Sequence, residues 1–259
     1  MSARDEWEAT FIPGTTVLAN KLGLTDADEL AAAEYRLTAA RERRIADGRI
    51  VIARTYDAEH LHAIHAALFS PLYEWAGVPR TYSLSKDGMW FAEPHQIGRY
   101  LDHARDHIAA VDWPDLDHGG FAVEAATVYA SINMSHPYRE GNGRAAKVFM
   151  SQLAEDAGYR LDYARITPQQ WVNAAMYSHP DLGTFEPVPD TLIPVFARIA
   201  EPITTPPPAA AQHPTRERTA HLEYLAELER QRHAQHRART DPDDAPSPPR
   251  ITPERYRRL

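Results

Sequence analysis

The stretch that decides the fold is residues 136–147, which read His136-Pro137-Tyr138-Arg139-Glu140-Gly141-Asn142-Gly143-Arg144-Ala145-Ala146-Lys147. The segments on either side, 121–135 and 144–157, both carry apolar residues at helical spacing, which predicts a helix before and after the stretch. Pro137 disfavours helical backbone at the residue before it, so the first helix should end there. The two glycines that follow permit a tight turn, and the whole segment therefore predicts helix, loop, helix.

The start of the second helix is a candidate anion site. Backbone N–H groups in the first turn of a helix have no intrahelical partner and lie at the positive end of the helix dipole. A loop containing Gly141, Asn142 and Gly143 can present further N–H donors to a phosphate, and the amide of Asn142 can add a contact. Arg144 and Lys147 are three residues apart, so they share one helix face and can reach the same polyphosphate.

Two other side chains in the stretch can do chemistry. Glu140 supplies a carboxylate that can hold Mg²⁺ between phosphate oxygens. His136 can take up a proton near neutral pH, because an unperturbed imidazole has a pKa of about 6.5. Together these groups are typical of a site for phosphoryl or nucleotidyl transfer. The alternative interpretation is an interhelical turn in which the histidine ends a helix and the two cations are solvated.

The same stretch resembles the signature of Fic-domain proteins, H-x-F-x-[D/E]-G-N-G-R-x-x-R. The identical positions are His136, Glu140, Gly141, Asn142, Gly143 and Arg144. Tyr138 stands where the family has Phe, and Lys147 stands where it has a second Arg. The resemblance implies a mostly α fold, with a Fic-type helical core, a central helix–loop–helix and a small β-hairpin flap. The spacing of a Walker A phosphate loop is absent.

The resemblance also implies an activity: a protein adenylyltransferase that moves AMP from ATP to a Tyr, Ser or Thr hydroxyl of a target protein. In that scheme His136 is the general base and Glu140 holds Mg²⁺. The implied nucleotide-binding residues are Glu140, Gly141, Asn142, Gly143, Arg144 and Lys147.

Two alternative functions are a phosphotransferase acting on a protein hydroxyl and a nucleotide-binding interaction protein with little turnover. A kinase-like relative has Lys at the position of Gly143, so the glycine favours adenylylation. The presence of both His136 and Glu140 argues against a protein that only binds.

A second local pattern lies at residues 80–92. Two short β-prone runs flank Lys86-Asp87-Gly88, and Asp-Gly between such runs predicts a hairpin turn. The resemblance implies that this hairpin is a flap that registers the target by adding its backbone as a strand. The predicted flap residues are Lys86, Asp87, Gly88, Met89 and Trp90.

The rest of the predicted core is helical, and residues 1–24 are expected to be extended or irregular. Thr25 is the predicted N-cap of the first long helix, and Glu34 is assigned to its solvated face. Thr167, Pro168 and Gln170 predict a capping box. The expected helices cover 25–46, 58–69, 94–111, 167–178 and 190–200.

Composition narrows the class of protein. The chain has 259 residues, a formal net charge of −8 and no cysteine, which excludes disulfides, a thiolate nucleophile and a cysteine zinc site. The negative charge argues against direct nucleic-acid binding. The N-terminus lacks the basic start and apolar run of a signal peptide, and no apolar stretch has the length of a membrane span. We therefore expect a cytoplasmic protein without a membrane association.

The chain divides into three predicted parts. Ten of its 21 prolines lie from Pro202 onward, which marks a boundary near residue 200. Residues 1–50 are the predicted N-terminal arm and helix, and 51–201 are the Fic core. Residues 202–259 are a predicted Pro-rich linker, a short helix and a basic tail of disordered composition.

Many Fic enzymes are inhibited through a helix with the pattern [S/T]-x-x-x-E-[G/N]. Four Thr-x-x-x-Glu pairs occur in this chain, and none is followed by Gly or Asn: Thr25/Glu29, Thr38/Glu42, Thr55/Glu59 and Thr219/Glu223. The hypothesis is therefore a separate small inhibitory protein, an antitoxin of a toxin–antitoxin pair. The alternative is inhibition by Thr219/Glu223 in the C-terminal helix.

Overall fold

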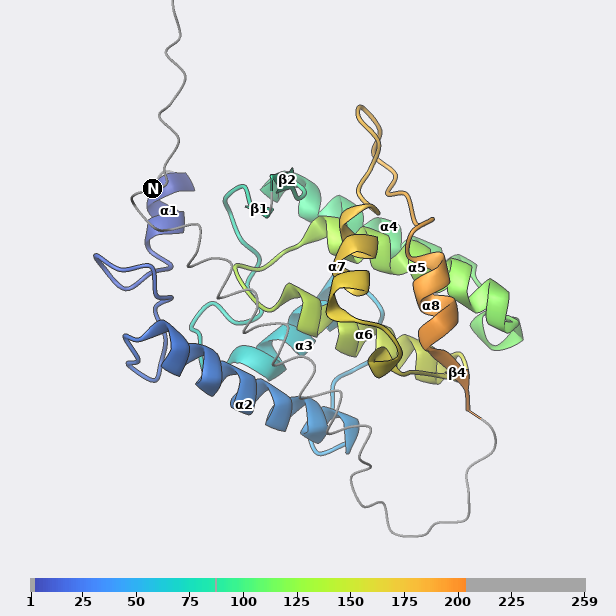
Figure 1. The fold of residues 1–259 in the computed structure, drawn as a ribbon, viewed down its shortest axis with the longest axis horizontal. Helices are drawn as coiled ribbons and strands as arrows, with labels where there is room; N and C mark the ends of the chain where they lie inside the picture. Colours follow the sequence, from blue (N-terminus) through green and yellow to red (C-terminus); the bar gives the residue numbers. More distant parts are fainter. Residues whose placement is uncertain (1–2, 87, 204–259) are drawn as a thin grey trace, which may run out of the picture.

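The computed structural model describes residues 3–86 and 88–203, which form a mostly helical fold with two small sheets (Figure 1). The α-helices are α1 Ala3–Glu8, α2 Ala27–Ala46, α3 Ala58–Phe69, α4 Ile97–Ala110, α5 His118–Ser135, α6 Asn142–Asp156, α7 Pro168–Met176 and α8 Ile193–Ile199. Short 3₁₀ turns lie at Pro94–Gln96, Trp113–Asp115 and Tyr163–Arg165. The strands are β1 Ser85–Lys86, β2 Met89–Trp90, β3 Tyr159–Leu161 and β4 Ala200–Pro202. The predicted mostly α fold with a small hairpin is confirmed.

Helices α5 and α6 form the centre, as the sequence predicted. Helix α5 packs against α4 and α8, and α6 packs against α3 and α5. Alanines at Ala122, Ala125 and Ala126 are fully covered, and their small side chains let neighbouring helices approach α5 closely. Across the described residues, no helix combines the length and the apolarity needed to cross a bilayer.

The start of α6 lies two residues earlier than predicted. Gly141 is the N-cap, with a left-handed φ of +84°, and the helix begins at Asn142. A glycine there also lets the ring of Phe69, the last residue of α3, lie where a Cβ would be. The loop therefore joins α6 to α3 as well as to α5.

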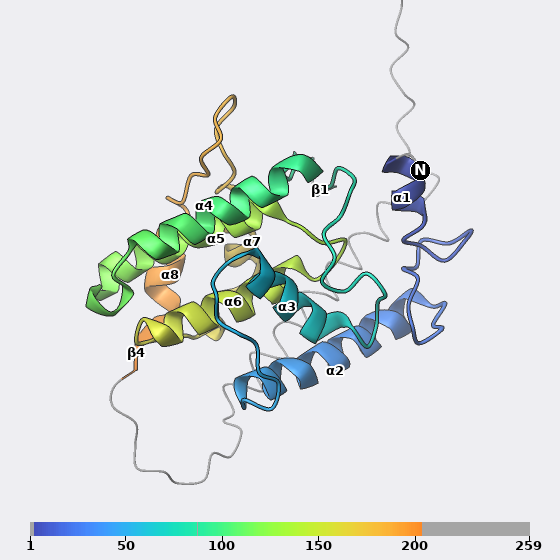
Figure 2. The same cartoon turned by 180° about the vertical axis from the view of Figure 1, so that it is seen from behind.

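Helix α2 differs from its prediction at two residues. Its N-cap is Asp26, whose side chain accepts hydrogen bonds from the amides of Asp28 and Glu29, so the assignment of Thr25 was wrong. Glu34 is buried rather than solvated. It lies on the same inward face as Leu30 and Thr38, where a carboxylate is stable only with a buried partner. Figure 2 shows α2 lying along α3, on which it packs.

The predicted hairpin is present. Ser85 pairs with Trp90 and Lys86 pairs with Met89 in antiparallel register, while Asp87 lies outside the described residues. A second antiparallel pair, β3 with β4, was not predicted. Each of its strands has three residues, which is too short for an alternating pattern to be recognised in the sequence.

The two ends of the described chain also differ from the expectation. The segment expected to be irregular contains α1, and Trp7 on it contacts Phe11 and Tyr82 edge to face. Helix α8 is shorter than 190–200, because Pro194 fits only the first turn of a helix. The predicted linker and C-terminal helix beyond residue 203, with Thr219 and Glu223, lie outside the described residues.

The close approach of Gly141 to Phe69 can be tested by Gly141→Ala. The added Cβ would lie 2.3 Å from the Phe69 ring, at a backbone conformation that alanine disfavours. Left-handed strain and overpacking together should lower the free energy of unfolding by roughly 2–4 kcal/mol, measured by urea denaturation. Gly98→Ala is the control, since a Cβ added at Gly98 in helix α4 would meet no neighbouring atom of the described residues within 4 Å. Equal stability of the two variants would contradict the packing argument.

Candidate active site

His136 ends helix α5 in a left-handed conformation, with φ 38° and ψ 59°. A positive φ at a residue other than glycine is uncommon, and such strain is concentrated at functional sites. The imidazole stacks on the ring of Phe91, which directly follows β2, with centroids 3.6 Å apart and planes at 11°. The histidine is thus held between the end of α5 and the base of the flap.

Arg80 contacts the same junction between the end of α5 and the hairpin. Its guanidinium donates to four backbone carbonyls: those of Tyr82, Ala92, Ser135 and His136. Burial lowers the pKa of Arg80 to about 10, so the side chain remains charged at neutral pH. A cation at the C-terminal end of α5 also complements the helix dipole. Sequence reasoning placed Arg80 only in a β-prone run, because no local pattern shows that it reaches α5.

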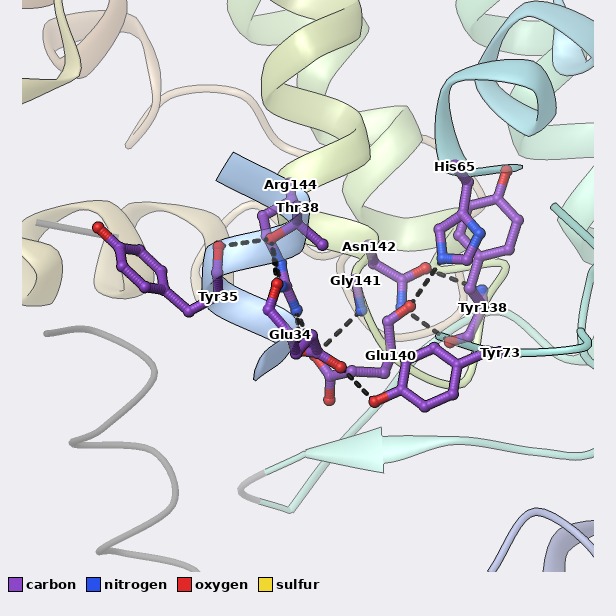
Figure 3. A network of polar contacts seen from close by, with 10 residues as sticks. All are labelled: Glu34, Tyr35, Thr38, His65, Tyr73, Tyr138, Glu140, Gly141, Asn142 and Arg144. Atoms are coloured by element: carbon purple, nitrogen blue, oxygen red, sulfur yellow. Dashed lines mark hydrogen bonds and ion pairs between the residues drawn. The ribbon is translucent and has the colours of Figure 1, made fainter. Parts of the chain in front are cut away.

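The loop after His136 is closed by reciprocal hydrogen bonds. The Tyr138 amide donates to Oδ1 of Asn142 at 2.8 Å, and Nδ2 of Asn142 donates to the Tyr138 carbonyl at 2.7 Å (Figure 3). The Asn142 side chain, which is predicted to contact an anion, bonds to the loop backbone here, and the residue also lines the pocket. Tyr138 is fully buried, and the hydroxyl that distinguishes it from Phe pairs with Nδ1 of His62 at 2.7 Å.

His65 on helix α3 packs against the loop and bonds to it. Its ring stacks on Tyr138 with centroids 3.7 Å apart, and Nε2 pairs with the Glu140 carbonyl at 2.9 Å. The other ring nitrogen accepts from the Gly77 amide, so Nε2 is the protonated nitrogen. Burial lowers the pKa of His65 to about 3, which keeps the imidazole neutral.

Glu140 presents a carboxylate to the site. Oε1 accepts from the Gly141 amide at 3.0 Å and lies 3.6 Å from Nη2 of Arg144. The side chain is 20% exposed, so it is accessible from the pocket that it lines. A partly exposed carboxylate is a hard oxygen ligand of the kind that Mg²⁺ prefers.

The two cations of α6 are buried, so the interpretation with solvated cations is wrong. Arg144 pairs with Glu34 of α2 and lies over the ring of Phe69 at 4.6 Å. The ammonium of Lys147 lies 4.7 Å from the centroid of Tyr163 and 5.0 Å from that of Trp171. Cation–π contacts of this length are favourable, and more so away from water.

One pocket brings the predicted residues together. Its lining contains His136, Glu140, Gly141, Asn142, Gly143, Arg144 and Lys147, and the flap residues Lys86 and Met89. Trp90 is instead 61% exposed, and neither it nor Gly88 is among the lining residues of the described chain. The lining residues that sequence reasoning did not assign to the site are Phe91, Tyr129, Asn133, Arg139, Trp171, Val172, Ala175, Met176 and His179.

Most of the unassigned residues come from α5 and α7, and apart from Asn133 their side chains are aromatic or aliphatic. The capping box of α7 was predicted and is present, with Thr167 and Gln170 exchanging hydrogen bonds. The resemblance places adenine contacts in this C-terminal part of the core without assigning residues, because Trp171 and Ala175 have the spacing of ordinary core residues. His179 follows α7, and its ring contacts Phe91 edge to face; burial lowers its pKa, which favours the neutral form.

The family model and similar curated proteins indicate the same family. The model of the Fic/DOC family matches residues 55–154. A probable protein adenylyltransferase of Sinorhizobium fredii, y4lH, is 35% identical over 173 residues, which are 64% of this chain and 85% of the relative. The protein adenylyltransferase VbhT of Bartonella schoenbuchensis is 34% identical over 168 residues, covering 64% of this chain and 35% of VbhT.

Solved structures share the fold. The BepC protein of Bartonella tribocorum, solved with bound AMPPNP, has a TM-score of 0.65 and 27% identity, covering 75% of this chain and 97% of BepC. The N-terminal Fic domain of a Bartonella quintana effector protein, solved with bound ADP, has a TM-score of 0.64 and 27% identity, covering 74% and 94% of the two chains.

His65 should make the stability of the fold depend on pH. Its pKa is about 3 in the folded protein and about 6.5 in an unfolded chain, so the unfolded state binds the proton more readily between these values. The contribution of His65 is complete above the unfolded pKa and is lost on acidification, by roughly 1.4 kcal/mol per pH unit below about pH 6.

The measurement is urea denaturation at neutral and mildly acidic pH. His65→Gln cannot take up the proton, so its free energy of unfolding should fall less on acidification than that of the wild type. His95→Gln, at an exposed position, is the control and should retain the wild-type slope. An unchanged slope in His65→Gln would show that the ring is not held neutral by the fold.

Proposed function

The chain belongs to the Fic/DOC family, and on that premise we propose that it is a protein adenylyltransferase that moves AMP from ATP to a hydroxyl of a target protein. The observation that carries the proposal is the pocket in which an imidazole, a carboxylate, the N-terminus of α6 and two cations meet. Relatives named protein adenylyltransferase and a structural neighbour with bound AMPPNP support it.

His136 is the proposed general base. It takes the proton from a Tyr, Ser or Thr hydroxyl of the target, whose oxygen then bonds to the α-phosphorus of ATP. The bond from that phosphorus to the bridging oxygen breaks, and pyrophosphate leaves with the electron pair. The stack on Phe91 and the clamp by Arg80 fix the position of the imidazole, which is the contribution of the fold to this step.

The opposite side of the pocket is the proposed phosphate site. The backbone at Gly141, Asn142 and Gly143 opens α6, so its amides can receive phosphate oxygens. Gly143 leaves space there, because a Cβ added to it would meet no neighbouring atom of the described chain within 4 Å. Arg144 and Lys147 add positive charge from the same helix. Glu140 would hold Mg²⁺, which supplies charge neutralisation on the phosphate oxygens.

The hairpin is the proposed site at which the target registers. Strands β1 and β2 pair only with each other among the described residues, so each has an edge that can accept an added strand. Lys86 and Met89 line the pocket, and the hairpin therefore reaches the reacting groups. A target strand paired on this edge would bring one of its hydroxyls toward His136.

A separate small antitoxin remains the proposed inhibitor, and the cytoplasm the proposed place of action. Glu29, Glu42 and Glu59, the described members of the Thr-x-x-x-Glu pairs, are not among the residues that line the pocket. None of the three could therefore occupy the phosphate site in this arrangement, which leaves an inhibitory group supplied by another chain, or the alternative at Thr219/Glu223, which lies outside the described residues.

Label transfer tests the activity directly. Purified protein, Mg²⁺ and a cell lysate are incubated with α-labelled or γ-labelled ATP in parallel. We expect protein labelling from the α-label only, reduced by about 10²–10⁴-fold in His136→Ala, because the proton acceptor is removed. His95→Ala, at an exposed histidine, is the matched control. Labelling only from the γ-position would identify a phosphotransferase instead, and no labelling from either would contradict both.

Lys147→Arg tests the phosphate contact. A guanidinium can make a second charge-assisted hydrogen bond, so the variant should stay active and bind ATP about three- to tenfold more tightly. Lys147→Met keeps much of the side-chain volume without the charge and should weaken binding. Titration calorimetry with ATP and Mg²⁺ measures both, and an unchanged affinity in both variants would remove Lys147 from the phosphate site.

A further inference from the structure

Helix α2 contributes a carboxylate to the interior of the site. Oε1 of Glu34 lies 2.5 Å from Nη2 of Arg144, and the two side chains are 7% and 8% exposed. Nη1 of the same guanidinium donates to the hydroxyl of Thr38, one turn further along α2, at 3.2 Å. Figure 3 shows Glu34, Thr38 and Arg144 close together, to the left of Asn142 and Tyr138 of the loop. Two donors of Arg144 are therefore directed at one face of α2.

The second oxygen of Glu34 is also occupied. The hydroxyl of Tyr73, a buried residue in the turn after α3, donates to Oε2. Burial first, and then the charge of Glu34, raise the pKa of Tyr73 well above its ordinary value, so the hydroxyl keeps its proton. The carboxylate is thus bonded through both oxygens and has one orientation.

The remaining surroundings of Arg144 restrict its plane. The ring of Phe69 lies under the guanidinium at 4.6 Å, and the Glu140 carboxylate lies 3.6 Å from Nη2. Arg144 still lines the pocket while it is paired with Glu34. A planar group with donors on several edges can bond to α2 and face a ligand at the same time.

We propose that Glu34 is a positioning residue for the nucleotide: it holds the guanidinium of Arg144 in the orientation that receives ATP phosphates. This inference rests on the proposed function. An inhibitory carboxylate would have to leave Arg144 when ATP binds. Departure of Glu34 would leave a buried carboxylate without its counter-charge, which is strongly destabilising. The pair is therefore retained with the nucleotide, and helix α2 is part of the site.

The test is nucleotide binding by Glu34→Gln, a variant of nearly equal volume without the charge. Calorimetry should show about tenfold weaker binding of AMPPNP with Mg²⁺, as expected for loss of one charge-assisted contact, and unchanged binding of adenosine, which has no phosphate. Glu29→Gln is the matched control, because Glu29 is exposed on the same helix; it should change neither affinity.

Three results would overturn the proposal. Tighter AMPPNP binding or faster label transfer in Glu34→Gln would make the contact inhibitory. Equal losses of affinity for AMPPNP and adenosine would show that the Glu34–Arg144 pair has only a general structural role. Unchanged affinity for both would show that the pair does not affect nucleotide binding.

A milder variant covers the case in which Glu34→Gln does not fold. Tyr73→Phe removes only the hydroxyl on Oε2 and keeps the ion pair, so AMPPNP binding should weaken by about threefold with adenosine unchanged. Nucleotide binding is measured separately from the transfer activity. A wild-type protein that binds AMPPNP but labels no protein would contradict the proposed adenylyltransferase activity. The comparison of AMPPNP binding between the wild type and Glu34→Gln would still test the positioning role of Glu34.

Discussion

The reciprocal hydrogen bonds between the Asn142 side chain and the backbone of Tyr138 are the constraint on which the site depends. They close the loop between α5 and α6 into a fixed shape, so His136 at its start and Gly141 at its end keep one separation. Helix α3 reinforces the closure through the stack of His65 on Tyr138 and through the ring of Phe69. A loop closed by hydrogen bonds between a side chain and the backbone can keep its side chains in place without being ordered by a ligand.

Two buried arginines connect this loop to other parts of the fold. Arg80 joins the end of α5 to both arms of the hairpin through backbone carbonyls alone. Arg144 joins the start of α6 to α2 through the Glu34 carboxylate. The first fixes His136 relative to the hairpin, and the second fixes the guanidinium of Arg144 relative to helix α2. Electrostatic groups placed in advance need little reorganisation during a reaction, which is the main source of catalysis in phosphoryl chemistry.

The residues that were predicted well are those whose signal is local. The helix on each side of residues 136–147, the capping box at Thr167 and the hairpin around Gly88 each depend on neighbours within a few positions. The failures are of two kinds. Thr25 and Asp26 are adjacent and equally suited to cap a helix, so composition could not choose between them. Strands β3 and β4 pair across about forty residues and have no pattern of their own.

The sequence by itself determined the helix–loop–helix, the candidate site residues of the loop and the family resemblance, because these lie within twelve consecutive residues whose spacing sets their geometry. Only the tertiary structure decided what surrounds them. Glu34, Arg80, Trp171 and His179 come from separate segments and have the local appearance of surface, strand or core residues. They meet the loop because helices pack where their apolar faces fit. The partner of a buried charge is therefore a property of the packed molecule and not of the neighbouring sequence.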